Sequence, residues 1–184
     1  FVGIVLGLGT MLGKMMAESG GADQIANALL TAFGKERVHW AMMFVAFIVG
    51  IPLFFEIGFV LLMPLVFIMA KRVQMPLVKI AIPLLAGLSV VHGLVPPHPG
   101  PLLAISIYNA DIGKTILYGL IVGLPTAIIA GPLFGGYIAR YVITQPAPEL
   151  AAQLAHEPEA KTLPGVGITL VTVLLPVFLM LLKS

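Results

Sequence analysis

Cysteine is absent from the 184-residue sequence, and charged residues are scarce. The first absence excludes a disulfide-stabilised fold and any cysteine-ligated metal site. Asp, Glu, Lys and Arg together make up 10% of the chain, against roughly 25% in ordinary soluble domains. The formal net charge of +2 gives no indication of nucleic-acid binding. Because 59% of the residues are hydrophobic, the composition predicts a protein that is embedded in lipid.

Common catalytic and nucleotide-binding motifs are also missing from the sequence. It contains no Walker A loop, no H-E-x-x-H helix and no G-x-S-x-G turn, so ATP-driven transport and the common hydrolase sites have no support. His92 and His98 lie close in sequence but have no third metal ligand nearby, and a zinc site needs at least three protein ligands. We therefore expect neither a metal nor a cofactor.

Five apolar stretches, separated by short charged islands, cover 1–13, 38–70, 80–110, 115–139 and 164–182. A helix of about 20 residues crosses a bilayer, so the pattern predicts an all-α membrane protein. The expected units are a partial transmembrane helix (1–17), an interfacial amphipathic segment (18–37), a re-entrant hairpin (38–70), a discontinuous transmembrane helix (76–109), a transmembrane helix (114–140), a cytoplasmic linker (141–163) and a transmembrane helix that starts the next unit (164–184). Because the chain opens and closes inside apolar runs, we expect it to be a segment of a longer protein.

The stretch 38–70 is too long for one straight crossing. Its 33 residues would form a helix of roughly 50 Å, whereas the hydrocarbon core is about 30 Å thick. Gly50 and Pro52 interrupt it in the middle, since Pro breaks the helical ladder and Gly permits a turn. We expect a re-entrant hairpin with its tip near 50–56. One tilted, kinked helix and two short full crossings are the alternatives.

Loop charges favour the hairpin over a single crossing. If 38–70 enters and leaves on one side, eight of the ten basic residues share a side, as the positive-inside rule requires. These are Lys14, Lys35, Arg37, Lys71, Arg72, Lys79, Arg140 and Lys161. Two full crossings give the same sidedness, so charge does not separate that alternative from the hairpin.

The stretch 80–110 contains a run that is rich in helix breakers. The sequence HGLVPPHPGP at 92–101 holds four prolines and two glycines, which predicts a break in the helix over 93–101. Helix should resume at about Leu102, with Pro101 in its first turn, and run to about Asn109. Irregular backbone at membrane depth must be buried in protein or line a wet cavity.

Glu56 is the one carboxyl within the long apolar stretches. An ionisable group at membrane depth costs several kcal/mol and is functional by default, so we expect Glu56 to couple a proton or to contact a ligand. The alternative is a structural acid that is bonded to nearby backbone or paired with a distant basic residue.

The broken segment carries the expected substrate-binding residues. His92 and His98 flank it, Ser89 lies one turn before His92, and small residues stand where backbone would meet a ligand. The full expected set is Ser89, His92, Gly93, His98, Gly100 and Asn109. Half-helix N-termini near Pro52 and Leu102 would supply free N–H groups to an anion. The alternative is that both histidines only satisfy carbonyl groups freed by the break.

The segment 86–101 resembles the gluconate:proton symporter family, also called gluconate permeases. Shorter segments at 9–14, 19–22, 50–56 and 110–115 agree with it in order and spacing. The resemblance implies proton-driven uptake of gluconate or a related sugar acid across a bacterial inner membrane. It also implies that the chain is one repeat of an inverted-repeat transporter that works by an elevator-type motion.

The expected partners follow from this resemblance and from the composition. They are a small gluconate-like organic anion, the proton, the lipid bilayer and the missing second half of the same chain, while a homodimer is left open. A passive organic-anion channel is the main alternative function. A membrane-embedded enzyme that uses Glu56 and the histidines is a weaker one, because paired catalytic motifs are lacking.

Overall fold

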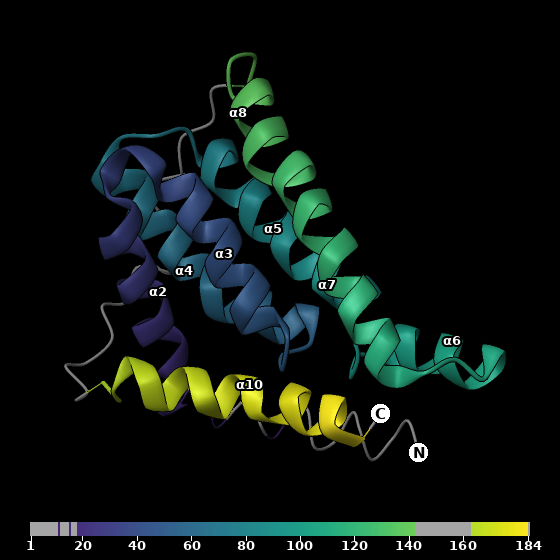
Figure 1. Ribbon diagram of the computed structural model, residues 1–184. Coiled ribbons are helices and arrows are strands. Elements are labelled where there is room, and N and C mark those ends of the chain that lie inside the picture. The colour runs from purple at the N-terminus through teal and green to yellow at the C-terminus, as the bar shows by residue number, and fades with distance from the viewer. Residues whose placement is uncertain (1–10, 12–14, 16–17, 143–162, 184) are drawn as a thin grey trace.

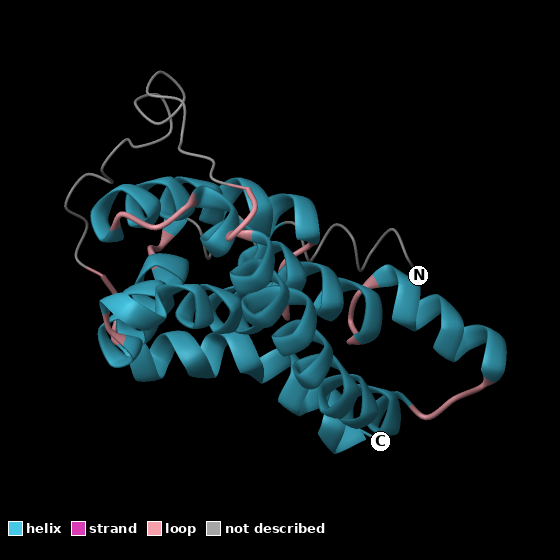
Figure 2. Ribbon diagram, turned by 90° about the horizontal axis from the view of Figure 1, so that it is seen from above, coloured by secondary structure: helices cyan, strands magenta, loops and turns pink. Residues whose placement is uncertain are grey.

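The computed structural model describes residues 11, 15, 18–142 and 163–183. This part of the chain is built from helices and short loops, and no strand occurs in it (Figure 2). The expected helix over 1–17 and most of the linker over 141–163 lie outside the described residues. In order, the elements are α2 (Gly21–Phe33), the 3₁₀ turn η1 (Lys35–Arg37), α3 (Val38–Gly50), α4 (Phe55–Val73), α5 (Leu77–Leu94), α6 (Pro99–Tyr108), α7 (Ile112–Ile128), the π-helical segment η2 (Ile129–Leu133), α8 (Phe134–Ile138) and α10 (Val166–Lys183).

Helix α5 is the centre of the fold, with α3 on one side and α7 on the other (Figure 1). Glycines make both contacts close. A Cβ on Gly87 of α5 would lie 2.7 Å from the carbonyl oxygen of Met43 on α3, and a Cβ on Gly119 of α7 would lie 2.6 Å from that of Leu94 on α5. Gly123 of α7, Gly131 of η2 and Gly135 of α8 also face α5, as small residues at helix–helix contacts do.

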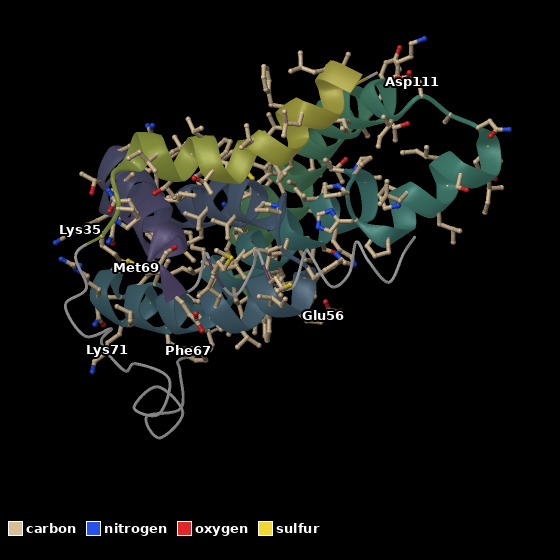
Figure 3. The ribbon with its side chains drawn as sticks, turned by 90° about the horizontal axis from the view of Figure 1, so that it is seen from below. Lys35, Glu56, Phe67, Met69, Lys71 and Asp111 are labelled. Atoms are coloured by element: carbon tan, nitrogen blue, oxygen red, sulfur yellow. The ribbon has the colours of Figure 1, made fainter. Side chains whose placement is uncertain are left out.

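The stretch 38–70 folds as two helices joined by a four-residue turn, so the predicted interruption is confirmed. Helix α3 ends at Gly50 and α4 begins at Phe55. Figure 3 places Lys35 and Lys71 at one end and Glu56 at the other, so the arms run antiparallel. The first arm has 13 residues, or about 20 Å. The second arm has 19 residues and extends beyond the predicted end at residue 70, because the helix continues to a left-handed cap at Gln74.

The stretch 80–110 is also interrupted, but over fewer residues than predicted. Helix α5 continues through Gly93 to Leu94, and α6 begins at Pro99 rather than near Leu102. The reason is that Pro99 and Pro101 fall in the first turn of α6, where a helix needs no N–H donors. The irregular segment is therefore 95–98. Its peptide bond between Pro96 and Pro97 is cis.

The remaining helices extend this arrangement. Helices α7 and α8 with η2 between them form one rod over 112–138, close to the expected 114–140. The π-helical segment contains Pro132, whose missing N–H disturbs the helical ladder. Helix α2 packs against α3. Helix α10 lies across the ends of α2 and α7 (Figure 1). The membrane crossing expected over 164–184 stays a prediction.

Two stretches of the described chain are long and apolar enough to cross a bilayer, namely Leu77–Tyr108 and Ile112–Ile138. The second presents a large exposed apolar surface, as a lipid-facing or partner-facing helix does. Its exposed members include Leu117, Tyr118, Ile121, Val122, Ile129, Leu133 and Phe134. These two apolar spans agree with the predicted membrane fold. So does the clustering of Lys35 and Lys71 at one end of the molecule, which we call the cationic end (Figure 3).

Candidate functional site

The hairpin tip at 53–55 lies against the broken helix at 92–98. His98 makes the central contact, because its ring is 2% exposed and lies between carbonyl oxygens from both segments. Its Nδ1 is 2.7 Å from the oxygen of Val95, and its Nε2 is 3.0 Å from the oxygen of Leu53. We refer to this region, residues 53–56 with 92–98, as the junction.

His92 makes a second contact across the junction, with the opposite polarity. The backbone N–H of Phe55 donates to His92 Nδ1 over 3.4 Å. Phe55 is the first residue of α4, so the side chain of His92 occupies one of the N–H groups that a helix N-terminus leaves free. His92 is half-buried, and it sits in the last turn of α5.

Aromatic contacts fill the space between the two histidines and the tip. The rings of His92 and His98 are 4.8 Å apart between centroids. Phe54 meets both edge-on, with centroids 6.2 Å from His92 and 6.1 Å from His98. Such edge-to-face pairs are favourable arrangements for rings. The ring of Phe55 also meets His92 edge-on, with centroids 6.5 Å apart. The tip therefore docks through two polar contacts and two aromatic side chains.

The N-terminal ends of α4 and α6 meet at the junction and retain free amides. Among the described residues, the N–H groups of Glu56 and Ile57 in α4 have no hydrogen-bond partner. In α6, Pro99 and Pro101 carry no N–H, and Leu102 donates to the carbonyl of His98. Gly100 is then the one amide of that first turn which the described residues leave unpaired. Free N–H groups at helix N-termini bind anions.

Glu56 lies at the hairpin tip, where the sequence placed it, and its side chain is exposed. It occupies the first turn of α4, where a carboxylate interacts favourably with the helix dipole. No ion pair of Glu56 with another described residue occurs. Its neighbour Phe55 contacts His92, so Glu56 lies close to that histidine, at the end of the hairpin opposite Lys35 and Lys71 (Figure 3).

The other predicted residues divide into two groups. Ser89, Gly93 and Gly100 are exposed near the break, and a Cβ added to either glycine meets no atom within 4 Å. Both glycines therefore border open space. Asn109 is not brought to the junction, because it caps the far end of α6, about 15 Å along a ten-residue helix. Figure 1 shows α6 projecting away from the other helices.

Sequence reasoning missed the partners of the histidines, which are Leu53, Phe54 and Phe55. They act through two backbone groups and two aromatic rings. The identity of these apolar residues in the sequence does not indicate such contacts. In the described chain no group of three or more potential metal ligands comes together. A pocket of about 500 Å³ lined by His39, Lys79 and Arg140 lies at the cationic end, away from the junction.

Comparison with known proteins is informative at the level of sequence, since no solved structure matches the chain. It is 72% identical over 184 residues to a gluconate permease of Pseudomonas aeruginosa and 50% identical over 181 residues to one of Zymomonas mobilis. It is 46% identical over 189 residues to a D-serine transporter of Escherichia coli. These alignments cover 98–100% of the chain but only 40–41% of the relatives' length.

The family model described as GntP family permease matches residues 1–184, the whole chain. The relatives are named as permeases or transporters, and the described chain has two apolar spans, as a membrane protein of this family would. The chain belongs to the GntP permease family.

Proposed function

We propose that this chain forms part of a proton-coupled secondary transporter that takes up gluconate or a related small hydroxy acid across the bacterial inner membrane. The observation that carries the proposal is the junction, where the N-termini of α4 and α6 meet beside two histidines. Discontinuous helices whose N-termini face a shared site mark the binding sites of secondary transporters.

The substrate class follows from the chemistry of this site. Stretches 38–70 and 80–110 contain no Lys or Arg, so an anion at the junction would be held by the amides of Glu56, Ile57 and Gly100 and by the dipoles of both helices. Relatives are named for gluconate, L-idonate and D-serine. All three compounds carry a carboxylate and at least one hydroxyl, and the carboxylate is the group these amides would bind.

Hydroxyl recognition would come from the exposed edge of the break. Ser89 and the half-buried His92 lie one helical turn apart on α5, where neighbouring side chains face the same way. Because the chain spans about 41% of its relatives' length, residues outside it would complete the site. The second half of the transporter is the expected source of those residues.

Proton coupling needs a group that titrates close to the bound anion. Three titratable side chains meet at the junction: Glu56, His92 and His98. In the proposed cycle the hairpin re-enters the membrane from the cationic end, and the junction moves as a unit in an elevator-type motion. A substrate carboxylate and a proton would then cross together.

The test is uptake by proteoliposomes that hold a full-length family transporter containing this chain. Gluconate, L-idonate and D-serine are offered with and without an inward proton gradient. We expect at least one of them to accumulate only when the gradient is present. Equal flux with and without the gradient, down the substrate's own concentration difference, would instead identify a passive channel. Product formation without any gradient would identify an enzyme.

A further inference from the structure

The ring of His98 faces two hydrogen-bond acceptors and no donor. The carbonyl oxygens of Val95 and Leu53 lie 2.7 and 3.0 Å from its two nitrogens. A carbonyl oxygen only accepts, and a neutral imidazole carries one N–H, so a neutral ring could bond only one of the two. An imidazolium carries an N–H on both nitrogens and satisfies both contacts.

His92 is bonded in the opposite sense. Its Nδ1 accepts the N–H of Phe55, which requires a lone pair on that nitrogen and a neutral ring with its hydrogen on Nε2. The two ring centroids are 4.8 Å apart, and two positive charges at that distance would repel each other. The hydrogen-bond pattern thus gives the pair one positive charge, and places it on His98.

We infer that His98 carries the coupled proton, and that its protonated ring fastens the hairpin tip to the broken helix. This inference rests on the proposed function. The Val95 contact lies within one turn of the chain, whereas the Leu53 contact spans 45 residues and joins two elements. When the ring loses its proton, one contact has no donor. Loss of the Leu53 contact releases the tip, so proton occupancy and tip position are linked.

The buried surroundings of His98 allow a positive charge on its ring only while the hairpin tip is docked on the broken helix. Leu53, Phe54, Val95 and Pro96 are all buried around it, and a charge in such surroundings is costly unless it is bonded and paired. The titratable group in contact with it is His92 from α5, whose ring centroid is 4.8 Å away. Glu56 of α4 is adjacent in sequence to Phe55, which contacts His92. Among the described residues, the contacts of the His98 ring involve none of the titratable side chains of α6 and α7, which are Tyr108, Lys114 and Tyr118.

Coupling to the substrate follows from the same charge. An anion held by the amides of α4 and α6 would lie near the imidazolium, so each would favour the binding of the other. Linkage requires that protonation strengthens anion binding by the same factor as the anion strengthens protonation. Because His98 is buried, it does not contact the substrate directly. It acts on the substrate through the electric field of its charge and through the position of the hairpin tip.

The experiment uses the full-length transporter in proteoliposomes and compares His98→Gln with His39→Gln. Glutamine keeps N–H donors but does not titrate, and His39 lies at the cationic end, away from the junction. We expect His98→Gln to lower gradient-driven uptake by at least about tenfold and to flatten the pH dependence of substrate Kd, within the range of allosteric couplings. Gradient-independent exchange should survive, and His39→Gln should behave as the wild type.

A second measurement covers the case in which His98→Gln does not fold. Nitrogen-15 NMR of the histidine-labelled, full-length protein with bound substrate should show His98 as an imidazolium ring. Its signal is assigned as the one that remains when the other histidines, which in this chain are His39, His92 and His156, are replaced one at a time by Gln. Undiminished gradient-driven uptake by His98→Gln, or a neutral His98 in the substrate-bound protein, overturns the inference. Failure of the proposed function looks different, because the wild type itself would then show no gradient-driven uptake.

Discussion

Gly119 of α7 faces the carbonyl oxygen of Leu94, the last residue of α5, so closely that a Cβ would lie 2.6 Å from it. The contact fixes α7 against the residue that directly precedes the break. Backbone cannot give way as the end of a flexible side chain can. The glycine therefore sets the distance between the long rod of α7 and the junction.

Replacing Gly119 with Ala should destabilise the protein by roughly 1–3 kcal/mol, the usual cost of overpacking. The matched control is Gly136→Ala on α8, where a Cβ meets no atom within 4 Å and Ala gains up to about 1 kcal/mol of helix propensity. Thermal unfolding of the full-length transporter in detergent measures both. A Gly119→Ala variant as stable as the control would contradict the close packing of α7 on α5.

The docking of the hairpin on α5 is testable by cross-linking. A Cβ on Gly50 would lie 3.9 Å from the Cβ of Val91, inside the range of about 3.5–4.5 Å that a disulfide needs. Gly50→Cys combined with Val91→Cys should form an intramolecular disulfide when membranes are oxidised, as peptide mapping by mass spectrometry reports. The control pairs Gly50→Cys with Gly93→Cys, whose Cβ has no neighbour within 4 Å. Cross-linking of the control alone would contradict the hairpin's position.

Helix breaks were readable from the sequence because they depend on local chemistry. Gly50 and Pro52 end one helix, and the prolines at 96 and 97 end another. The start of α6 was misplaced by three residues, since Pro99 both breaks the preceding helix and suits the first turn of the next. Local composition alone does not decide between those two roles.

The chemistry of the junction was only partly readable. Nearness of the hairpin tip to the break was predicted, as were the two histidines. Their partners were not, because the oxygen of Leu53 and the N–H of Phe55 are backbone groups that every residue type offers. The position of α10 against α2 and α7 also depends on tertiary packing, which the hydropathy of 164–182 does not specify.

Gly100 tests whether the open space at the break belongs to the substrate. Gly100→Leu should raise the KM of uptake at least about tenfold, equivalent to about 1.4 kcal/mol, because the side chain would fill the space beside the free amide. Folding should be preserved, since a Cβ there meets no atom within 4 Å. Gly136→Leu is the control in an equally open position. An unchanged KM with intact folding would place the substrate elsewhere.

Glu56→Gln should shift the pH dependence of uptake toward lower pH, by up to about one pH unit. A carboxylate close to the site that loads the proton favours the protonated form of that site, so without it a higher proton concentration is needed to load the site. Uptake rates across a pH series for wild type and variant measure the shift. Complete loss of gradient-driven uptake with intact exchange would assign the coupled proton to Glu56 instead of His98. An unchanged profile would mean that the acid only stabilises the start of α4.

In a substrate-bound structure of the full-length transporter, the carboxylate should lie within about 8 Å of the first turns of both α4 and α6, because dipole stabilisation fades beyond the terminal turn. Each helix end acts as roughly half a positive charge, and together with protonated His98 they offset the single negative charge without Lys or Arg. A sugar alcohol of the same length, which keeps the hydroxyls but lacks the carboxylate, should therefore fail to compete for uptake. A carboxylate farther than this from both helix ends, or full competition by the alcohol, would reduce the Pro-rich break to a rigid hinge packed against the hairpin.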